Sequence, residues 1–422
     1  MTLARTSLLN GVAVVVKISC ALVLNKIIAV YLGPAGYAIL GTFQNIVSIL
    51  HNISGGILAT GVTKVTAQHF DDARHQYTIW QTALRIALIL SSMIAIGVLV
   101  FQTRLAQLFL GDEKLSTVFI WLAALIPAAV ANNLLLAIIN GKKEVGLYVA
   151  ANIGGSVTTL IVAGALTIAF GLHGVLVALC INPFFVLVLT AFLASRREWF
   201  RLGRFWGKSN QKVIGELWGY GAMGLATAIV VPVTFILIRD HLINAFGTTA
   251  AGHWQGAWKL SETYLLLATT PLAVYYLPRI AEIRTPRLLQ KEIARVYAFI
   301  LPVAIVAALA IYLLRDVVIQ TLFTDDFLPM QILFAWQLTG DVLKIGAWVL
   351  AYVMLGRAMV RTYIVTEVVF AGSFYGFARL FTDAYGLQGV SIGYAVNYAI
   401  YWVVMAAIVT RELSTMRREE ST

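Results

Sequence analysis

The chain has 422 residues, of which 60% are hydrophobic and 12% are charged, and its net charge at pH 7 is +11. Soluble proteins carry about 25% charged residues, so this chain could not cover its own surface in water. Long apolar runs recur along its whole length, each near the roughly 20 residues that a membrane-spanning helix needs. The composition therefore predicts a polytopic, all-α integral membrane protein.

The apolar runs predict twelve spans, six in each half of the chain. Lys17 interrupts the first run and no small-residue cleavage site follows, so we expect a retained helix rather than a signal peptide. The predicted spans cover residues 7–31, 38–61, 79–102, 117–140, 146–169, 174–194, 213–238, 253–278, 295–314, 331–355, 362–380 and 387–410.

The distribution of Lys and Arg predicts the orientation of these spans, because cytoplasmic loops collect basic residues. Most of the 31 basic residues lie in alternate segments that include both termini, which we therefore place in the cytoplasm. The segments predicted to lie outside hold only Arg104, Lys114, Arg239, Arg315 and Arg379. Topology and contact with anionic lipid explain the positive charge, and no nucleic-acid partner is predicted.

Cysteine and histidine give no sign of a disulfide framework, a metal site or another cofactor. Cys20 and Cys180 both fall inside predicted spans, and the six histidines show no metal-ligand spacing. The connections between spans are short, and the chain has no glycine-rich phosphate loop, nucleophile elbow or catalytic pair of carboxylates. These observations favour a transporter over an enzyme.

The two halves of the chain resemble copies of one another. The basic stretch RREWFRLGRFWGKSNQK separates them, and the motif GLxGV at 171–175 recurs at 386–390. Six helices per copy would give both copies the same orientation, related by an axis along the membrane normal. We predict an N-terminal six-helix lobe, a basic cytoplasmic linker, and a C-terminal six-helix lobe at residues 1–195, 196–212 and 213–422.

One predicted span carries a charged stripe where water is expected to be absent. Gln337, Asp341, Lys344, Trp348 and Tyr352 follow steps of four, three, four and four residues, so they share one helix face. A charge at bilayer depth costs at least ~2.5–3.5 kcal/mol, which disfavours a position facing lipid. The stripe is therefore predicted to face protein or a hydrated cavity.

Other spans carry similar polar groups. Lys259 and Glu262 repeat the spacing of Asp341 and Lys344 with the charges reversed. One interpretation is that each pair is a structural ion pair within its own helix. Lys26 is expected to snorkel toward headgroups. A net-basic passage for an anionic substrate is the alternative, formed with Lys17, Asn45, Ser48, Asn52, Arg85 and Glu367.

Three stretches resemble a known family. LFAWQLTGDVLKIGAWVLAYVML (333–355), YLGPAGYAILGTFQNIVSIL (31–50) and GVTKVTAQ (61–68) are similar to the Wzx family of lipid-linked oligosaccharide flippases, especially members that handle enterobacterial common antigen and O-antigen units. The resemblance implies a V-shaped exporter fold in the bacterial inner membrane. It also implies an undecaprenyl-diphosphate oligosaccharide as substrate, with polysaccharide polymerase and chain-length regulator as candidate partners.

Basic cavities are typical of that family, and diphosphate cannot cross hydrocarbon without compensating charge. We therefore expect one set of residues to bind the substrate. A second set would couple transport to an ion, either H+ or Na+. The predicted substrate-binding residues are Lys17, Lys259, Lys344, Arg85, Asn45, Asn52 and Trp348, and the predicted coupling residues are Asp341, Glu262 and Glu367.

Two other functions remain open from the sequence. A cation-coupled multidrug exporter of the same superfamily would favour acids over bases in its cavity, whereas the deep bases here slightly outnumber the acids. A membrane enzyme of polysaccharide assembly would usually need a larger soluble loop than this chain offers.

Overall fold

The computed structural model describes residues 3–56, 58–207 and 211–421, and over these residues the regular structure is entirely helical. Eight helical segments in this part of the chain are long and apolar enough to cross a membrane. Four of them have 58, 50, 48 and 59 residues, more than twice the roughly 20 that one span requires. Two spans in each long segment and one in each other segment agree with the predicted twelve.

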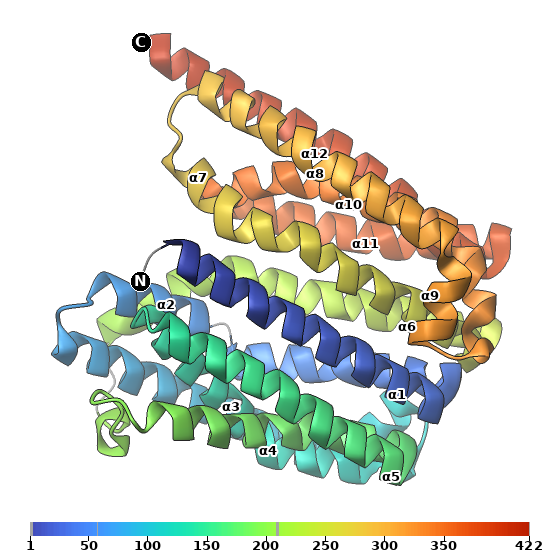
Figure 1. Ribbon diagram of the computed structural model, residues 1–422, viewed down its shortest axis with the longest axis horizontal. Coiled ribbons are helices and arrows are strands. Elements are labelled where there is room, and N and C mark those ends of the chain that lie inside the picture. Colours follow the sequence, from blue (N-terminus) through green and yellow to red (C-terminus); the bar gives the residue numbers. More distant parts are fainter. Residues whose placement is uncertain (1–2, 57, 208–210, 422) are drawn as a thin grey trace. The chain divides into compact units, whose positions relative to one another are not determined.

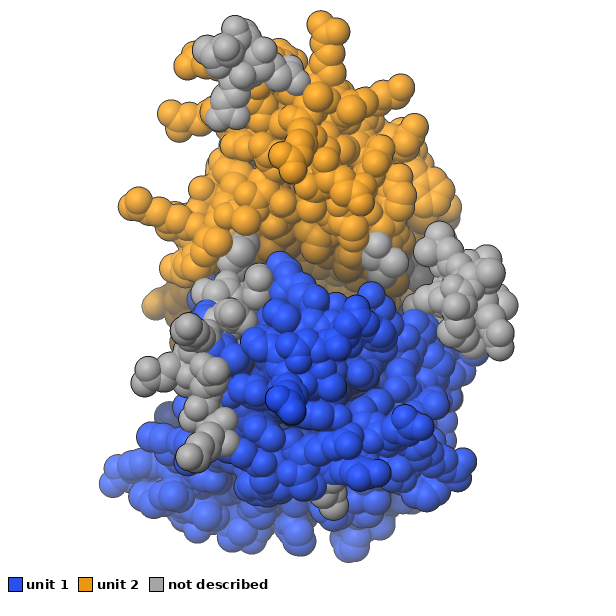
Figure 2. All heavy atoms as spheres, turned by 90° about the vertical axis from the view of Figure 1, so that its left-hand side faces the viewer, with its two compact units in different colours: residues 1–232 blue, residues 233–422 orange. Residues whose placement is uncertain are grey.

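The chain divides into two compact units, residues 1–232 and 233–422, which Figure 2 shows in two colours. Unit 1 contains α1 to α5, the short helices between them and the beginning of α6 (Figure 1). Its elements are α1 (Leu3–His51), the π-helix η1 (Asn52–Gly56), α2 (Leu58–Gln68), α3 (Ala73–Leu110), η2 (Glu113–Leu115), α4 (Ser116–Gly141), α5 (Val145–Ala194) and η3 (Leu202–Phe205).

Unit 2 begins at Val233, inside α6. The lobe border that the sequence predicts, at residues 196–212, stays a prediction. Residues 208–210 of the predicted linker lie outside the described residues. The elements that follow are α6 (Gln211–Pro271), the π-helix η4 (Leu272–Tyr276), α7 (Leu277–Glu282), α8 (Pro286–Leu313), α9 (Arg315–Leu322), η5 (Asp325–Met330), α10 (Gln331–Gly356), α11 (Val360–Tyr385), η6 (Gly386–Gln388) and α12 (Gly389–Ser421).

The predicted internal repeat recurs in the backbone. Gly171 and Gly386, 215 residues apart in number, both have positive φ, at 56° and 63°. Lys143 and Ala358 have the same separation, and they are the only non-glycine residues with positive φ in the described chain. Positive φ places the backbone in the left-handed region, so these positions interrupt the helices. Equivalent turns therefore occur at equivalent places in both halves.

A single glycine divides α1 into two spans. Gly33 has φ 60° and ψ −175°, and Pro34 follows it without an N–H group for the helical ladder. Gly247 divides α6 in the same manner, with φ 85° and ψ 166°. Glycine adopts positive φ at no steric cost, which explains why each break falls on this residue type.

The outer surface of both units is apolar, as a membrane protein requires. Met93, Val100, Ile161, Phe299 and Val403 are each more than 60% exposed, a pattern that water would penalise and lipid would not. A buried aromatic and aliphatic core lies beneath this surface in each unit. The chain is therefore a multi-pass membrane protein.

Two details differ from simple expectations based on the sequence. Arg239, which the sequence placed in an outside segment, is 2% exposed within α6, where it donates a hydrogen bond to Gln255 and lies 5.7 Å from the Trp254 ring. The side of the membrane on which it lies stays a prediction. The first part of the predicted linker is also packed against unit 1. Trp199 donates a hydrogen bond to Glu144, and Arg204 donates one to the hydroxyl of Tyr77.

Candidate functional site

Helix α10 lies at the centre of unit 2, and two of its glycines admit aromatic rings from α12. A Cβ atom at Gly340 would lie 2.3 Å from the Tyr394 ring, and one at Gly346 would lie 2.7 Å from the Trp402 ring. Both distances are far shorter than van der Waals contact, so only glycine fits at these positions. The close approach brings the Tyr394 hydroxyl to the residue after Gly340, which is Asp341.

The Asp341 carboxylate is completely buried and accepts hydrogen bonds from three hydroxyl groups. Ser261 and Tyr264 on α6 donate to Oδ2 at 2.6 and 2.8 Å, and Tyr394 on α12 donates to Oδ1 at 2.8 Å. Gln337, one turn earlier on α10, donates to Ser261 at 3.2 Å. We call these five residues the Asp341 cluster. It connects three helices through one carboxylate.

Lys344 lies in an aromatic cage and forms no ion pair with Asp341 among the residues that the structure describes. Its Nζ atom is 4.7 Å from the Trp258 ring centre, 4.9 Å from Trp348, 5.0 Å from Tyr398 and 5.5 Å from Tyr394. Aromatic faces attract a desolvated cation through their quadrupoles. The structure thus contradicts a direct intrahelical ion pair between Asp341 and Lys344, which the sequence had left open.

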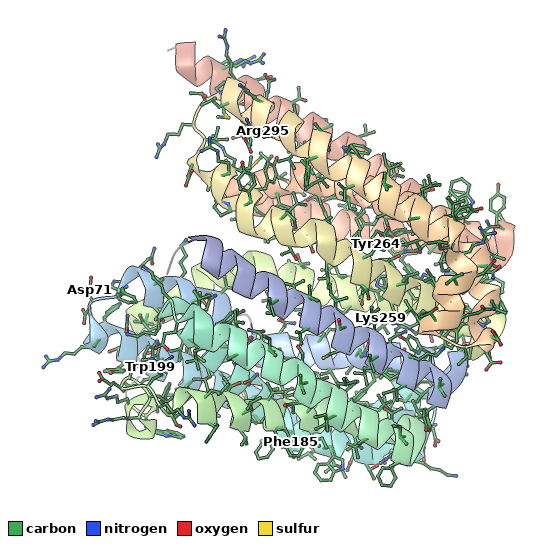
Figure 3. All side chains as sticks on the ribbon, in the orientation of Figure 1. Asp71, Phe185, Trp199, Lys259, Tyr264 and Arg295 are labelled. Carbon is green, nitrogen blue, oxygen red and sulfur yellow. The ribbon has the colours of Figure 1, made fainter. Side chains whose placement is uncertain are left out.

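Lys259 and Glu262 do form the intrahelical ion pair that their spacing allows. Their N–O distance is 3.0 Å, and their side chains are 37% and 49% exposed. The Trp258 indole N–H also donates to Glu262 at 3.0 Å while its ring faces Lys344. Figure 3 labels Lys259 and Tyr264 on the same stretch of α6. Trp258 therefore links this exposed pair with the buried Lys344 cage.

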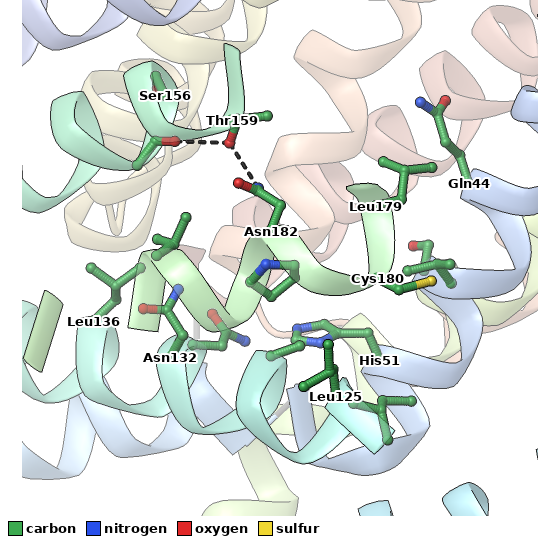
Figure 4. Close-up of a pocket in the computed structure, with 18 of the residues that line it drawn as sticks. Gln44, His51, Leu125, Asn132, Leu136, Ser156, Thr159, Leu179, Cys180 and Asn182 are labelled. Carbon is green, nitrogen blue, oxygen red and sulfur yellow. Dashed lines mark hydrogen bonds between the residues drawn. The ribbon is translucent and has the colours of Figure 1, made fainter. Parts of the chain in front are cut away.

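Unit 1 contains a pocket of about 490 Å³ between its long helices α1, α4 and α5. Lys17 and Gln44 of α1 line it, together with Asn132 of α4 and Asn182 of α5, as Figure 4 shows for the last three. The polar lining residues are Lys17, Gln44, Ser48, His51, Asn132, Asn133, Asn152, Ser156, Thr159 and Asn182. Among the lining residues that the structure describes, none is Asp or Glu.

Two amide oxygens in this pocket lack a donor. The Oδ1 atoms of Asn132 and Asn182 are buried and accept no hydrogen bond in the described structure. The Asn182 amide does donate to Thr159 at 2.8 Å, which fixes its orientation in Figure 4. A buried carbonyl oxygen without a donor costs about 1–3 kcal/mol. Both residues line the pocket, and their oxygens are polar groups of its wall that the described structure leaves without a donor.

The remaining predicted residues of unit 1 do not line the unit 1 pocket. Asn45 is half-buried and does not line the unit 1 pocket, and Asn52 donates to the backbone oxygen of Ser48 at 2.8 Å. Arg85 is exposed on α3. In unit 2, Glu367 is half-buried on α11 and lies within electrostatic range of Lys344 and Tyr398. Their roles in binding or coupling stay predictions.

Sequence reasoning missed most of the polar residues of both sites. The amides of the unit 1 pocket carry no charge, so the cost of burying charge did not single them out. A usable signal existed, because Asn152, Ser156 and Thr159 follow steps of four and three along one face of α5. Tyr264 and Tyr394 could not be assigned to Asp341, because they come from helices distant in the sequence.

No metal site emerges from these groups. The described residues contain no group of three or more His, Cys, Asp or Glu side chains that could hold a metal ion. Carboxylate and hydroxyl oxygens suit H+ or Na+, and the Asp341 cluster offers both kinds of oxygen. The nature of a coupling ion stays a prediction.

The arrangement of helices defines a polytopic exporter fold. A structure titled an inward-facing multidrug resistance MATE family transporter of the MOP superfamily matches 96% of this chain and 99% of its own, with a TM-score of 0.82 and 16% identity. The likeness confirms the predicted all-α exporter fold. At this identity it carries no information about substrate.

Sequence comparison identifies the family. The family described as polysaccharide biosynthesis protein matches residues 13–332, so the chain belongs to that family. It is also similar to the lipid III flippases of Escherichia coli K12 and Shigella flexneri, each 29% identical over 409 residues, or 97% of this chain and 98% of theirs. These matches confirm the predicted resemblance to lipid-linked oligosaccharide flippases. The named relatives are transport proteins rather than enzymes.

Proposed function

We propose that this protein is a flippase for an undecaprenyl-diphosphate-linked oligosaccharide of the O-antigen or enterobacterial common antigen type. The observation that carries the proposal is the unit 1 pocket, whose described lining is rich in amides and hydroxyls, includes Lys17 and contains no Asp or Glu. Amides and hydroxyls can donate hydrogen bonds to sugar hydroxyls and accept them. The full-length similarity to proteins named lipid III flippase supports the same substrate class.

Lys17 supplies the charge that the rest of the substrate needs. It is exposed and lines the same pocket as the amides. A diphosphate is strongly anionic and the polyprenyl tail is apolar, so only the head requires a polar route through the membrane. The pocket would bind the sugars and Lys17 the diphosphate, while the tail stays in lipid.

The charge of the pocket disfavours a multidrug exporter of cationic compounds. Cationic drugs need a carboxylate to offset their charge inside a membrane, and the described lining of the unit 1 pocket contains only the basic Lys17 and neutral groups. A multidrug exporter is therefore the weaker proposal, although the fold is shared.

We assign coupling to the Asp341 cluster, with Glu262 and Glu367 as further candidates and H+ or Na+ as the ion. Protonated aspartic acid donates one hydrogen bond, whereas the carboxylate only accepts. All three hydroxyls around Asp341 donate to it, so protonation would remove the negative charge and weaken these three hydrogen bonds. Because Ser261 and Tyr264 belong to α6 and Tyr394 to α12, the change would alter how both helices hold α10.

The protein is proposed to act in the bacterial inner membrane, from the cytoplasmic to the periplasmic leaflet, with both termini cytoplasmic. Polysaccharide polymerase and chain-length regulator are the proposed partners. A reporter fused after Met416 should report the cytoplasm, and one near Asp325 should report the periplasm. The opposite result at both positions would contradict this orientation.

The function is tested with purified protein in liposomes that contain the lipid-linked oligosaccharide. We expect the protein to move the sugar head between leaflets without altering the lipid covalently. Efflux of cationic drugs without movement of the lipid would instead identify a multidrug exporter. A covalently altered lipid would identify an enzyme.

A further inference from the structure

A second cavity in unit 2 opens between α8 and α12, which lie side by side in Figure 1. It is an elongated groove with a volume of about 490 Å³. The α8 side is lined by Gln290, Ala294, Tyr297 and Leu301, which follow steps of four, three and four residues. This spacing forms one stripe along the helix, so the groove runs parallel to α8.

The α12 side of the groove has the same character. Trp402, Ala406, Val409 and Leu413 line it at steps of four, three and four residues. Ala294 of α8 and Ala406 of α12 are both exposed, and their short side chains leave room between the helices. Apart from Gln290 and Thr410 near one end, the described lining is apolar or aromatic.

At the end of the groove formed by Tyr297 and Trp402, the polar atoms of both side chains bond to groups inside unit 2. Tyr297 donates its hydroxyl proton to the backbone oxygen of Gly346 at 2.7 Å, and Trp402 donates to the Tyr297 oxygen at 2.9 Å. Both rings are thus held by hydrogen bonds inside the unit. The groove has one polar end and one apolar end.

Basic residues extend both stripes beyond the polar end. Arg287 lies three residues before Gln290 on α8, and Arg417 lies four residues after Leu413 on α12, so each continues the face that lines the groove. Arg417 donates to Gln290 at 3.0 Å, which brings the two helices together there. Lys291 adds a third exposed positive charge beside Gln290.

The described carboxylates nearby are bound to other groups. Glu292 accepts from Tyr275 at 3.0 Å and pairs with Arg295 at 3.4 Å. Glu412 pairs with Arg357 at 3.3 Å. Neither carboxylate lines the groove, so the end marked by Arg287, Lys291 and Arg417 favours an anion.

The length of the groove matches one leaflet. From Gln290 to Leu301 the helix rises about 16 Å, at 1.5 Å per residue. The hydrocarbon core of a bilayer is about 30 Å thick, so the groove covers roughly half of it. An apolar groove as long as one leaflet, with basic residues at one end, fits a phospholipid with an anionic headgroup.

We propose that this groove binds an anionic phospholipid, with one acyl chain between α8 and α12 and its phosphate against Arg287, Lys291 and Arg417. This groove shares no residue with the unit 1 pocket or with the Asp341 cluster. The proposal does not depend on the transported substrate.

The test measures lipid binding to the purified full-length protein by native mass spectrometry. Phosphatidylglycerol and phosphatidylcholine with identical acyl chains serve as probes. Phosphatidylglycerol should bind more tightly, and the double substitution Arg287→Gln with Arg417→Gln should weaken its binding by roughly thirtyfold. The control, Arg74→Gln with Arg361→Gln, removes the same charge from exposed positions outside the groove and should leave the affinity unchanged.

A second pair of variants tests the acyl-chain part of the site. Ala406→Phe fills the groove and should abolish preferential binding, whereas Ala407→Phe, an exposed neighbour that does not line it, should not. Equal binding of both phospholipids, or equal weakening in the control variants, would overturn the proposal. Tighter binding of undecaprenyl phosphate than of phosphatidylglycerol would also overturn it, because the groove would then serve a polyprenyl tail.

Discussion

The unit 1 pocket and the Asp341 cluster use polar residues in opposite ways. In unit 2, the buried carboxylate accepts three hydrogen bonds and Lys344 is surrounded by aromatic rings, so the charges that stand out in the sequence are satisfied internally. In unit 1, neutral amides line a pocket and two of their oxygens lack donors. The comparison teaches that the charges of unit 2 that stand out in the sequence belong to an internal network, whereas the proposed binding pocket of unit 1 combines one lysine with neutral amides.

The strongest test of this contrast is Lys344→Ala. It removes a buried side chain from among four rings, and we expect a loss of about 2–5 kcal/mol of stability, as for other large-to-alanine changes in a core. Thermal melting of the purified protein measures it. Lys344→Met retains the volume and should restore most of the stability; a wild-type melting temperature for Lys344→Ala would place this lysine in a substrate cavity instead.

Lys17→Ala should reduce transport without reducing thermal stability. Lys17 is exposed in the unit 1 pocket, so its loss should leave the melting temperature unchanged. A hydrogen bond to a charged group contributes about 1.5–3 kcal/mol, so transport of the lipid-linked oligosaccharide should fall roughly ten- to hundredfold. Lys114→Ala, an exposed lysine in η2, is the control and should transport normally.

Asp341→Asn tests the coupling role of the buried cluster. Asparagine keeps the shape and can still accept hydrogen bonds, but it carries no charge and does not titrate. Substrate binding should persist while the dependence of transport on a proton or sodium gradient disappears. Glu262→Gln and Glu367→Gln are compared in the same assay, and gradient-driven transport at the wild-type rate by Asp341→Asn would remove Asp341 from the mechanism.

Asn132→Leu separates binding from stability in unit 1. Removing a buried oxygen without a donor should leave the free energy of unfolding unchanged or raise it by about 1 kcal/mol. Transport should nevertheless fall about fivefold, because one hydrogen bond to the sugar is lost. Asn140→Leu, at an exposed position of α4 outside the pocket, serves as the transport control; a loss of stability in Asn132→Leu would show that its amide supports the fold.

The smallest effect is expected at Lys259 and Glu262. Their ion pair is partly exposed, and such pairs contribute about 0–1 kcal/mol. Lys259→Met should therefore shift the melting temperature only slightly. A shift as large as that of Lys344→Ala would mean that Trp258, which donates to Glu262, depends on the pair for its position against the Lys344 cage.

Much of the fold could be predicted from the hydropathy and the internal repeat of the sequence. The apolar runs predicted the spans, and the GLxGV motif marked turns whose glycines, Gly171 and Gly386, share positive φ. The burial of Arg239 was not predicted, because hydropathy penalises any arginine, whereas this one has Gln255 and the Trp254 ring as partners. Tertiary partners of this kind are not encoded in local composition.

The candidate sites were only partly accessible. The stripe through Asp341 and Lys344 was found from helical spacing, but its interpretation depended on Ser261 and Tyr394, which lie 80 and 53 residues away in the sequence. In the unit 1 pocket, Lys17 and Ser48 were singled out from the sequence, whereas Asn132 and Asn182 were not, because neutral amides cost less to bury than charges.

The most direct test of the central claim is site-specific photo-crosslinking to the lipid-linked oligosaccharide. A diazirine amino acid replaces Leu136, which lines the unit 1 pocket, or Ile161, which is 63% exposed on α5 and does not line it. The account predicts a crosslink to the sugar head at position 136 and none at position 161. Crosslinking at 161 without any at 136 would contradict recognition of the oligosaccharide in this pocket.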